Sequence, residues 1–504
     1  MLTETAHEDF PAFLRRPALR SPDLRSPAFR RPSFWPRVRE FAVPPAMIEA
    51  ATARRLAGDW AGACAAARFD VDLNLRTAER TWGAELAALV RDDLRHLAPD
   101  LLRWHLPRIA PDGLLRPGLT MALASYGAAG GGGGHVVHLV VRTPPARADA
   151  GQRVSLALWD GTGGDAGAPG PSSSRYPHPH PDRRFRLDVH RHLWDARRAG
   201  ELRIRSGAEL PASSGGSGPE PVAPHAAPST ADLFAVVPEG HPCAVGRWAA
   251  EARLVLLAEG RTSGSVTVRL SHRHRLLLEL PEHDAGLRLS ALSADNKSAA
   301  LPVLPDAATW VLPDLELLRT GAVVAGQLHP LVASALVPDA AVAGVRGAGA
   351  PVPPRAGAPH LVECRGARHR IALVDGVLAA LDHDPAELRR EELLVALNGP
   401  PLPCLRVIDE AHRSPECLNG VRERLAHGDI TGALAVVEGL LGPQAVLRDG
   451  ALRDELAAVA RRKVAYGLFR AGLSGPKPGV PRRGKPDWVV RDTGGRQRRD
   501  TGRS

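Results

Sequence analysis

Glycine and proline recur so densely in this sequence that no long, unbroken sheet or helical bundle can run through it. The chain has 504 residues, of which 50 are glycine and 46 are proline. Several stretches consist almost entirely of glycine, proline, serine and alanine, a composition typical of flexible connections. We therefore predict modules joined by linkers at 206–232 and 341–359, with a flexible insert at 161–182.

The segments between these linkers show both helical and strand periodicity, which predicts a mixed, multi-module α+β fold. Hydrophobic residues make up 44% and charged residues 24%, so a wholly disordered or fibrous chain is excluded. Six units follow in order: a disordered Pro/Arg-rich arm (1–42), a helical unit (43–116), a small β-containing unit (117–205), a mixed α/β unit (233–340), a β-hairpin plus helical unit (360–473) and a disordered basic tail (474–504).

Proline spacing defines the first of these units. Pro17, Pro22, Pro27 and Pro32 recur at every fifth residue. Proline at this interval is incompatible with a helix and unfavourable in a central strand, so an extended arm is expected.

Apolar residues in the next two units change from helical to strand periodicity. One helical face carries Leu86, Leu89, Val90, Leu94 and Leu97, which predicts a helix ending near Pro99. Strands are predicted at 135–141 and 154–159, after the run Gly130–Gly134. That run is read as a loop, because no lysine follows it at the spacing of a phosphate-binding loop.

The mixed unit that follows contains helical and strand patterns. A helix is predicted at 248–257, with weaker helical patterns at 312–319 and 331–336. Apolar residues alternate over 266–280, which indicates strand structure.

The strongest local signals lie near the C-terminal end. Asp375 and Gly376 separate two short apolar runs, which predicts a β-hairpin. Asp384 then fits a helix N-cap, followed by Pro385 and by Glu387 as the partner in a capping box. The leucines of this helix are expected on a buried face: Leu388, Leu393, Leu394 and Leu397.

A short sequence is repeated near the two ends of the chain. Residues 55–63 and 424–433 align on Gly-Asp-x-x-Gly-Ala. In each copy the first glycine can end one helix and the aspartate can cap the next. Both copies predict helical hairpins similar to the turn of tetratricopeptide-type repeats, although two distant copies do not make a solenoid.

The net charge of +10 is concentrated at the two ends. Residues 461–504 contain thirteen Lys or Arg against three Asp, and 1–42 contain eight Arg against five acids. The intervening chain is therefore nearly neutral. The basic tail could bind nucleic acid, since cations beside an aromatic ring suit phosphates and bases. The residues concerned are Arg482, Arg483, Lys485, Trp488, Arg496, Arg498 and Arg499.

The use of cysteine and lysine indicates the cellular compartment of the protein and the kind of genome that encodes it. The five cysteines are scattered and form no Cys-x-x-Cys, which favours reduced thiols over a disulfide framework or zinc finger. Only four of the 65 basic residues are lysine, a bias typical of GC-rich bacterial genomes. With no long apolar stretch and no secretory leader pattern, we expect a cytoplasmic protein without a membrane partner.

Three sequence patterns are candidates for a catalytic or metal-binding role. Residues 405–412 resemble the Walker B segment of DEAH-type helicases, but none of the lysines lies in a phosphate-binding loop, so we interpret the similarity as chance. The pairs His178/His180, His190/His192 and His272/His274 would share a face if each lay on a strand. Such pairs could supply metal ligands, but edge-of-core histidines are the simpler interpretation.

The third pattern is a thiol site. Cys364, His369 and Asp375 fall within one predicted hairpin, where a Cys–His couple could generate a thiolate. Buried structural cysteine is the commoner alternative.

We assign no catalytic, cofactor-binding or metal residue from the sequence. The favoured hypothesis is a non-enzymatic interaction or scaffold protein with an unidentified protein partner. Nucleic-acid binding through the tail and a cryptic hydrolase or metal-dependent enzyme are the alternatives.

Overall fold

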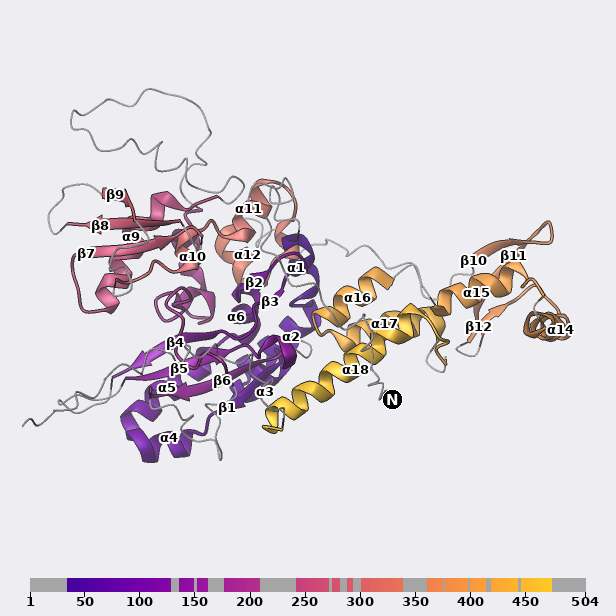
Figure 1. Cartoon of the computed structure of the whole chain (residues 1–504), viewed down its shortest axis with the longest axis horizontal. Helices are drawn as coiled ribbons and strands as arrows, with labels where there is room; N and C mark the ends of the chain where they lie inside the picture. The colour runs from indigo at the N-terminus through magenta and orange to yellow at the C-terminus, as the bar shows by residue number, and fades with distance from the viewer. Residues whose placement is uncertain are drawn as a thin grey trace, which may run out of the picture.

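The computed structural model describes residues 34–127, 136–148, 152–161, 176–208, 242–271, 274–281, 288–292, 301–338, 360–374, 377–397, 399–413, 418–442 and 446–473. It shows a broad body from which a helical arm projects, with a small module at the arm's far end (Figure 1). Helices and several small sheets are both present, which confirms the predicted mixed α+β class. Among the described residues, no helix has the length and apolar character needed to cross a bilayer.

A four-stranded sheet lies in the body, in the order β1-β6-β5-β4. Its strands are β1 (Phe69–Asp72), β4 (Thr120–Tyr126), β5 (Val137–Arg142) and β6 (Val154–Trp159). The strands at 135–141 and 154–159 are thus confirmed. Strand β1 lies in the range predicted to be helical, and it pairs in parallel with the sequence-distant β6. Its four residues are too few for a periodicity to be detected.

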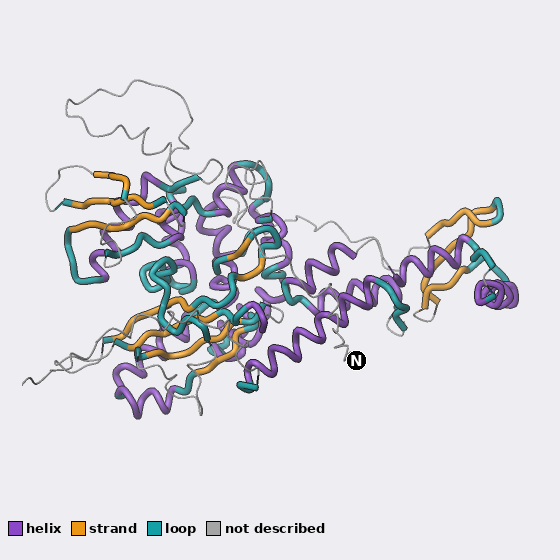
Figure 2. Tube along the Cα trace, in the orientation of Figure 1, coloured by secondary structure: helices purple, strands orange, loops and turns teal. Residues whose placement is uncertain are grey.

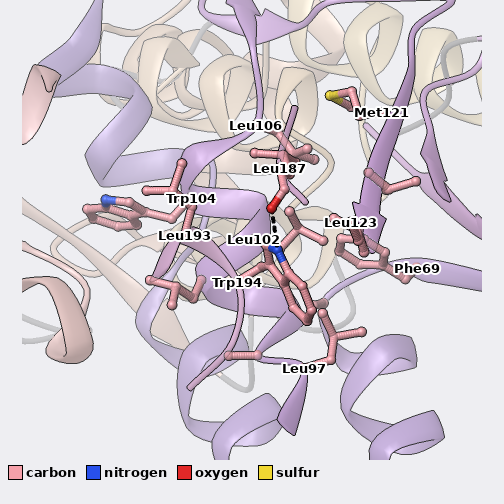
Figure 3. Packing of buried hydrophobic residues seen from close by; sticks show 14 of the residues in the cluster. Phe69, Leu97, Leu102, Trp104, Leu106, Met121, Leu123, Leu187, Leu193 and Trp194 are labelled. Atoms are coloured by element: carbon pink, nitrogen blue, oxygen red, sulfur yellow. Dashed lines mark hydrogen bonds between the residues drawn. The ribbon is translucent and has the colours of Figure 1, made fainter. Parts of the chain in front are cut away.

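Helices cover one face of this sheet and form the largest core (Figures 1 and 3). Leu86, Val90, Leu94 and Leu97 are buried there, as predicted, but Leu89 is 55% exposed. Figure 3 shows Trp194 within this core, where its indole Nε1 donates to the Leu187 carbonyl at 2.9 Å. The helices of this part are α2 (Pro45–Leu56), α3 (Trp60–Ala66), α4 (Leu75–Trp82), α5 (Ala84–His96) and α6 (Pro99–His105).

Residues 35–41 correct the prediction of an extended arm over 1–42. They form helix α1 (Trp35–Phe41), whose Val38 and Phe41 are buried in the body. Pro36 lies in the first turn of this helix, where its missing N–H breaks no intrahelical hydrogen bond. The earlier prolines of the arm lie outside the described residues.

Segments from later in the chain complete the body. The largest core also receives residues from α11 (Pro313–Arg319) and α12 (Pro330–Leu336), which confirms both weaker helical predictions. The remaining short elements are β2 (Arg108–Ile109), β3 (Leu114–Leu115), η3 (Ala146–Ala148), η5 (Arg191–Leu193), η6 (Ala199–Glu201), α7 (Leu202–Ser206) and η8 (Ala325–Gln327).

A second core forms where α9 (Val245–Ala258) and α10 (Asp306–Thr309) pack on another small sheet. The predicted helix at 248–257 is confirmed. The alternation over 266–280 belongs to two antiparallel strands rather than one, β7 (Gly264–Arg269) and β8 (Arg275–Leu280), followed by β9 (Arg288–Ala291). The chain reverses between Ser271 and His274, where the His274 amide donates to the Ser271 hydroxyl at 2.9 Å.

The C-terminal module, residues 360–413, contains a three-stranded antiparallel sheet and two helices. Its elements are β10 (His360–Cys364), β11 (Ala367–Val374), β12 (Val377–Ala380), α14 (Pro385–Ala396) and α15 (Pro403–Arg413). Val374 pairs with Val377, so the predicted hairpin is confirmed, while Asp375 and Gly376 lie outside the described residues.

Helix α14 departs from its prediction in two respects. Asp384 caps it by accepting from the Ala386 amide at 3.0 Å, as expected. The Glu387 carboxylate binds Arg365 instead of completing a capping box. Leu393, Leu394 and Leu397 are 66%, 51% and 79% exposed, so the expected buried face is wrong for all three. The module's core is too small to cover the end of this helix.

The arm consists of α16 (Leu418–Ala426), α17 (Ile430–Leu441) and α18 (Ala451–Arg470). Its base is attached to the body by ion pairs and aromatic contacts. On β1, Asp70 accepts from Tyr466, and Asp72 binds Arg470. The ring of Phe469 lies edge-on to that of Tyr176, 5.5 Å away. The C-terminal module lies at the opposite end of the arm (Figures 1 and 2).

Candidate metal centre in the C-terminal module

Four potential metal ligands converge in the C-terminal module. They are the sulfur atoms of Cys364 and Cys404 and one ring nitrogen each of His369 and His383. These four ligand atoms all lie within 4.8 Å of one another. We refer to the four residues as the Cys/His cluster.

Strand pairing explains how the first two members meet. Cys364 is the last residue of β10 and pairs with Ala367 across a turn made by Arg365 and Gly366. Both turn residues have positive φ, 54° and 79°, as a tight two-residue hairpin turn requires. His369 lies two positions beyond Ala367 and therefore on the same face of the sheet as Cys364.

The other two members come from the segments that flank α14. His383 immediately precedes the N-cap Asp384, and Cys404 lies in the first turn of α15. The Nδ1 atom of His369 and the Nε2 atom of His383 are 2.6 Å apart, with the rings edge to face. The cluster thus draws together the sheet and both helices of the module.

Most of the Cys/His cluster is buried. Cys364 and Cys404 are fully buried, His383 is 8% exposed and His369 is half-buried. Burial, reinforced by the hydrogen bond with Cys364, raises the pKa of the Cys404 thiol to about 11. An enclosed neutral thiol is a poor nucleophile, so this environment disfavours covalent catalysis by Cys404.

A carboxylate lies behind one of the histidines. The Oε2 atom of Glu387 is 3.5 Å from Nδ1 of His383, the ring nitrogen that points away from the cluster. A carboxylate in this position orients a metal-binding imidazole and fixes its tautomer. The other oxygen of Glu387 binds Arg365 at the β10–β11 turn.

The thiol site predicted from the sequence is therefore present only in part. Cys364 and His369 do meet, whereas Asp375 lies outside the described residues. His383 and Cys404 were missed because no spacing rule covers ligands separated by 4, 13 and 20 residues. The one usable signal was a Cys and a His flanking a tight turn.

Residues 405–412, which resemble a Walker B segment, lie in helix α15 rather than at the end of a strand. Asp409 in this helix pairs with Arg413 at 2.8 Å and with Arg448 at 2.5 Å. Cys404, which immediately precedes residues 405–412, belongs to the Cys/His cluster.

None of the described histidines from the three predicted pairs joins the Cys/His cluster. His178 and His180 are exposed, and the ring of His180 lies edge-on to Trp159 at 5.1 Å. His190 and His192 are buried in and beside the short helix η5, not on a strand. His274 lies in the β7–β8 turn, and His272 is outside the described residues, as is the whole predicted basic tail.

Comparisons of the chain with protein-family models, curated proteins and solved structures each found no match.

Proposed function

We propose that this protein is an interaction or scaffold protein that binds a partner through helix α14. The observation that carries the proposal is the exposure of Leu393, Leu394 and Leu397 at the end of that helix. Leucines exposed to this degree on adjacent turns form a compact apolar surface, which is typical of binding sites.

The two sides of α14 differ in what they contact. Glu387 and Glu391 are both bound to Arg365, and Leu388 packs on the module's core. Helical spacing places a second set of residues on the side that faces away, which we call the outer face of α14. It consists of Ala386, Arg389, Arg390, Leu393 and Leu397, all exposed.

The chemistry of the outer face indicates the kind of partner. Leu393 and Leu397 are one helical turn apart, the spacing at which a helix inserts anchors into an apolar groove. Arg389 and Arg390 lie on either side of that apolar line. A protein with an apolar groove rimmed by carboxylates would complement this face in both shape and charge.

The position of α14 supports a presenting role for the rest of the chain. The module lies at the free end of the arm, away from the body (Figure 1). The arm is attached to the body at its base by Arg470 with Asp72 and by Arg37 with Glu423. Such an arrangement would hold the outer face away from the body.

The test uses the full chain with a photo-crosslinking residue at position 397, or at Val324 as the control. Val324 is a 64% exposed apolar residue of the body. We expect one protein to be crosslinked from position 397 and not from 324. The L393E/L397E variant should bind the purified partner at least tenfold more weakly, since it lacks the two leucines that binding would bury. Charge reversal in R389E/R390E should weaken binding most at low salt.

Three outcomes would contradict the proposal. One is unchanged partner binding by L393E/L397E. Another is self-association that this variant abolishes, which would make the occupant a second copy of the chain. The third is capture of nucleic acid that depends on residues 474–504 and not on the two leucines, which would favour the tail.

A further inference from the structure

We infer that Cys364, His369, His383 and Cys404 bind one zinc ion, and that this ion holds the C-terminal module together. The inference is independent of the interaction role. It rests on the identity of the donors, on their separations and on the composition of the module's core.

The donor set indicates the metal. Two thiolates and two imidazoles are the ligands of tetrahedral zinc, whereas magnesium and calcium require oxygen donors. The cluster supplies four protein ligands and so leaves no coordination position open. A closed set of this kind is typical of structural rather than catalytic zinc.

The distances agree with one shared ion. Zinc bonds of about 2.3 Å to sulfur and about 2.0–2.1 Å to nitrogen place tetrahedral donors roughly 3.3–3.8 Å apart. All four ligand atoms of the cluster lie within 4.8 Å of one another. The ring nitrogens of His369 and His383 are 2.6 Å apart, with a hydrogen between them. An ion bound by both nitrogens would replace that hydrogen, and the distance between the nitrogens would increase by less than about 1 Å.

The composition of the module explains why it needs a metal. Its buried apolar residues, among those described, are Cys364, Ile371, Ala380, Leu402, Cys404 and Ile408. Two of these six are the proposed ligands themselves. So few apolar side chains cannot stabilise three strands and two helices by burial alone, and small folds of this size commonly use a metal ion.

The surroundings of His383 support the assignment independently. Glu387 lies 3.5 Å from Nδ1 of this histidine and would keep Nε2 free to bind the ion. Glu387 also belongs to α14, whose N-cap directly follows His383. The ion would therefore determine where α14 begins and how it is oriented on the sheet.

The experiment measures metal in the full-length chain by mass spectrometry. We expect one zinc per chain, and none in C364S or H383N. The matched controls are C243S, which alters a free cysteine of the second core, and H274N, which alters an exposed histidine. Both controls should retain one zinc.

Because ligand variants can misfold, a second measurement uses the unaltered chain. Replacing zinc by cobalt should produce the intense visible absorption of a tetrahedral cobalt site and a near-ultraviolet thiolate band. Removal of metal with a chelator should open residues 360–413 to protease while the body remains resistant.

A third measurement concerns Glu387 as a positioning residue. E387Q should weaken zinc binding by roughly 10- to 100-fold in chelator competition. E391Q is the control, because Glu391 also binds Arg365, whereas the carboxylate paired with His383 is that of Glu387. Equal affinities of these two variants would refute the role of Glu387.

The zinc inference would be overturned by a chain that contains no stoichiometric metal and gives no tetrahedral cobalt spectrum. It would equally be overturned if another metal, such as iron, were present one per chain and lost in C364S. Loss of partner binding by L393E/L397E with zinc retained would separate the two proposals experimentally.

Discussion

At the scale of single residues, burial changes what a polar side chain does. Glu251 on α9 is 3% exposed, and the Nε and Nη2 atoms of Arg205 donate to its two carboxylate oxygens at 2.6 and 2.7 Å. His190 lies 3.1 Å from the same carboxylate. His190, one member of a histidine pair considered from the sequence as a possible metal site, thus takes part in an ion-pair network that joins α7 to α9.

This network predicts an acid-dependent loss of stability. Burial by itself would raise the pKa of Glu251, but hydrogen bonds from Arg205 and His190 outweigh it and lower the pKa to about 2. The stabilisation is therefore complete above about pH 4.5 and is lost as the pH falls towards 2, with a total of roughly 3 kcal/mol. Thermal unfolding followed from pH 7 to pH 3 should show this slope.

The variant E251Q should unfold at a lower temperature at pH 7 and should lose part of that pH dependence. E259Q is the control, since Glu259 is exposed and pairs with Arg186 at 3.4 Å. Identical acid slopes in the native chain and E251Q would show that other carboxylates cause the loss.

At the scale of elements, local sequence signals predict well where hydrogen bonds connect near neighbours. The repeated Gly-Asp turns are the clearest case. Asp59 accepts from the Gly62 amide at 2.8 Å, and Asp429 accepts from the Gly432 amide at 3.1 Å. Each aspartate also binds an arginine five residues before it, at 2.9 and 3.1 Å. The similarity predicted from sequence therefore extends to side-chain contacts.

The two turns differ in their surroundings, which predicts unequal effects of removing the cap. D429A should destabilise α17 by about 1 kcal/mol, and hydrogen exchange of residues 430–441 should accelerate accordingly. Its effect should also reach the body, because Arg68 donates to the His427 carbonyl at 2.9 Å and lies 3.8 Å from Asp429. The control D59A should accelerate exchange only in α3. If exchange in D429A became faster in α17 alone, the proposed connection between this turn and the body would be contradicted.

At the scale of the whole molecule, the arm is connected to the body by sequence-distant pairs. Tyr466 and Arg470 of α18 bind alternate residues of β1, Asp70 and Asp72. Alternation along a strand places these two aspartates on one face, where α18 can reach both. The edge strand β1 thus serves both the sheet and the arm.

Loss of these contacts should loosen the arm. In Y466F/R470A we expect hydrogen exchange in the last turns of α18 to rise at least tenfold and small-angle scattering to show a larger radius of gyration. R453A, which removes an exposed pair with Asp449 near the start of the same helix, should leave both unchanged. An unaltered radius of gyration in Y466F/R470A would mean that the remaining contacts are sufficient to hold the arm against the body.

The sequence by itself determined the α+β class, the helix over 86–97, the hairpin around 375 and the two Gly-Asp turns. In each case the controlling interactions join residues close together in the chain, so composition and spacing record them. It also indicated a thiol and an imidazole beside one turn, although not what joins them.

Only the tertiary structure decided the remaining features. Strand β1 exists through its pairing with β6, helix α1 through burial in the body, and the exposure of Leu393 and Leu397 through the small size of the module. The Cys/His cluster forms when a β-turn, a loop and a helix start from separate parts of the chain meet. Contacts between distant residues leave no periodicity in the sequence, because their geometry is set by packing and not by spacing.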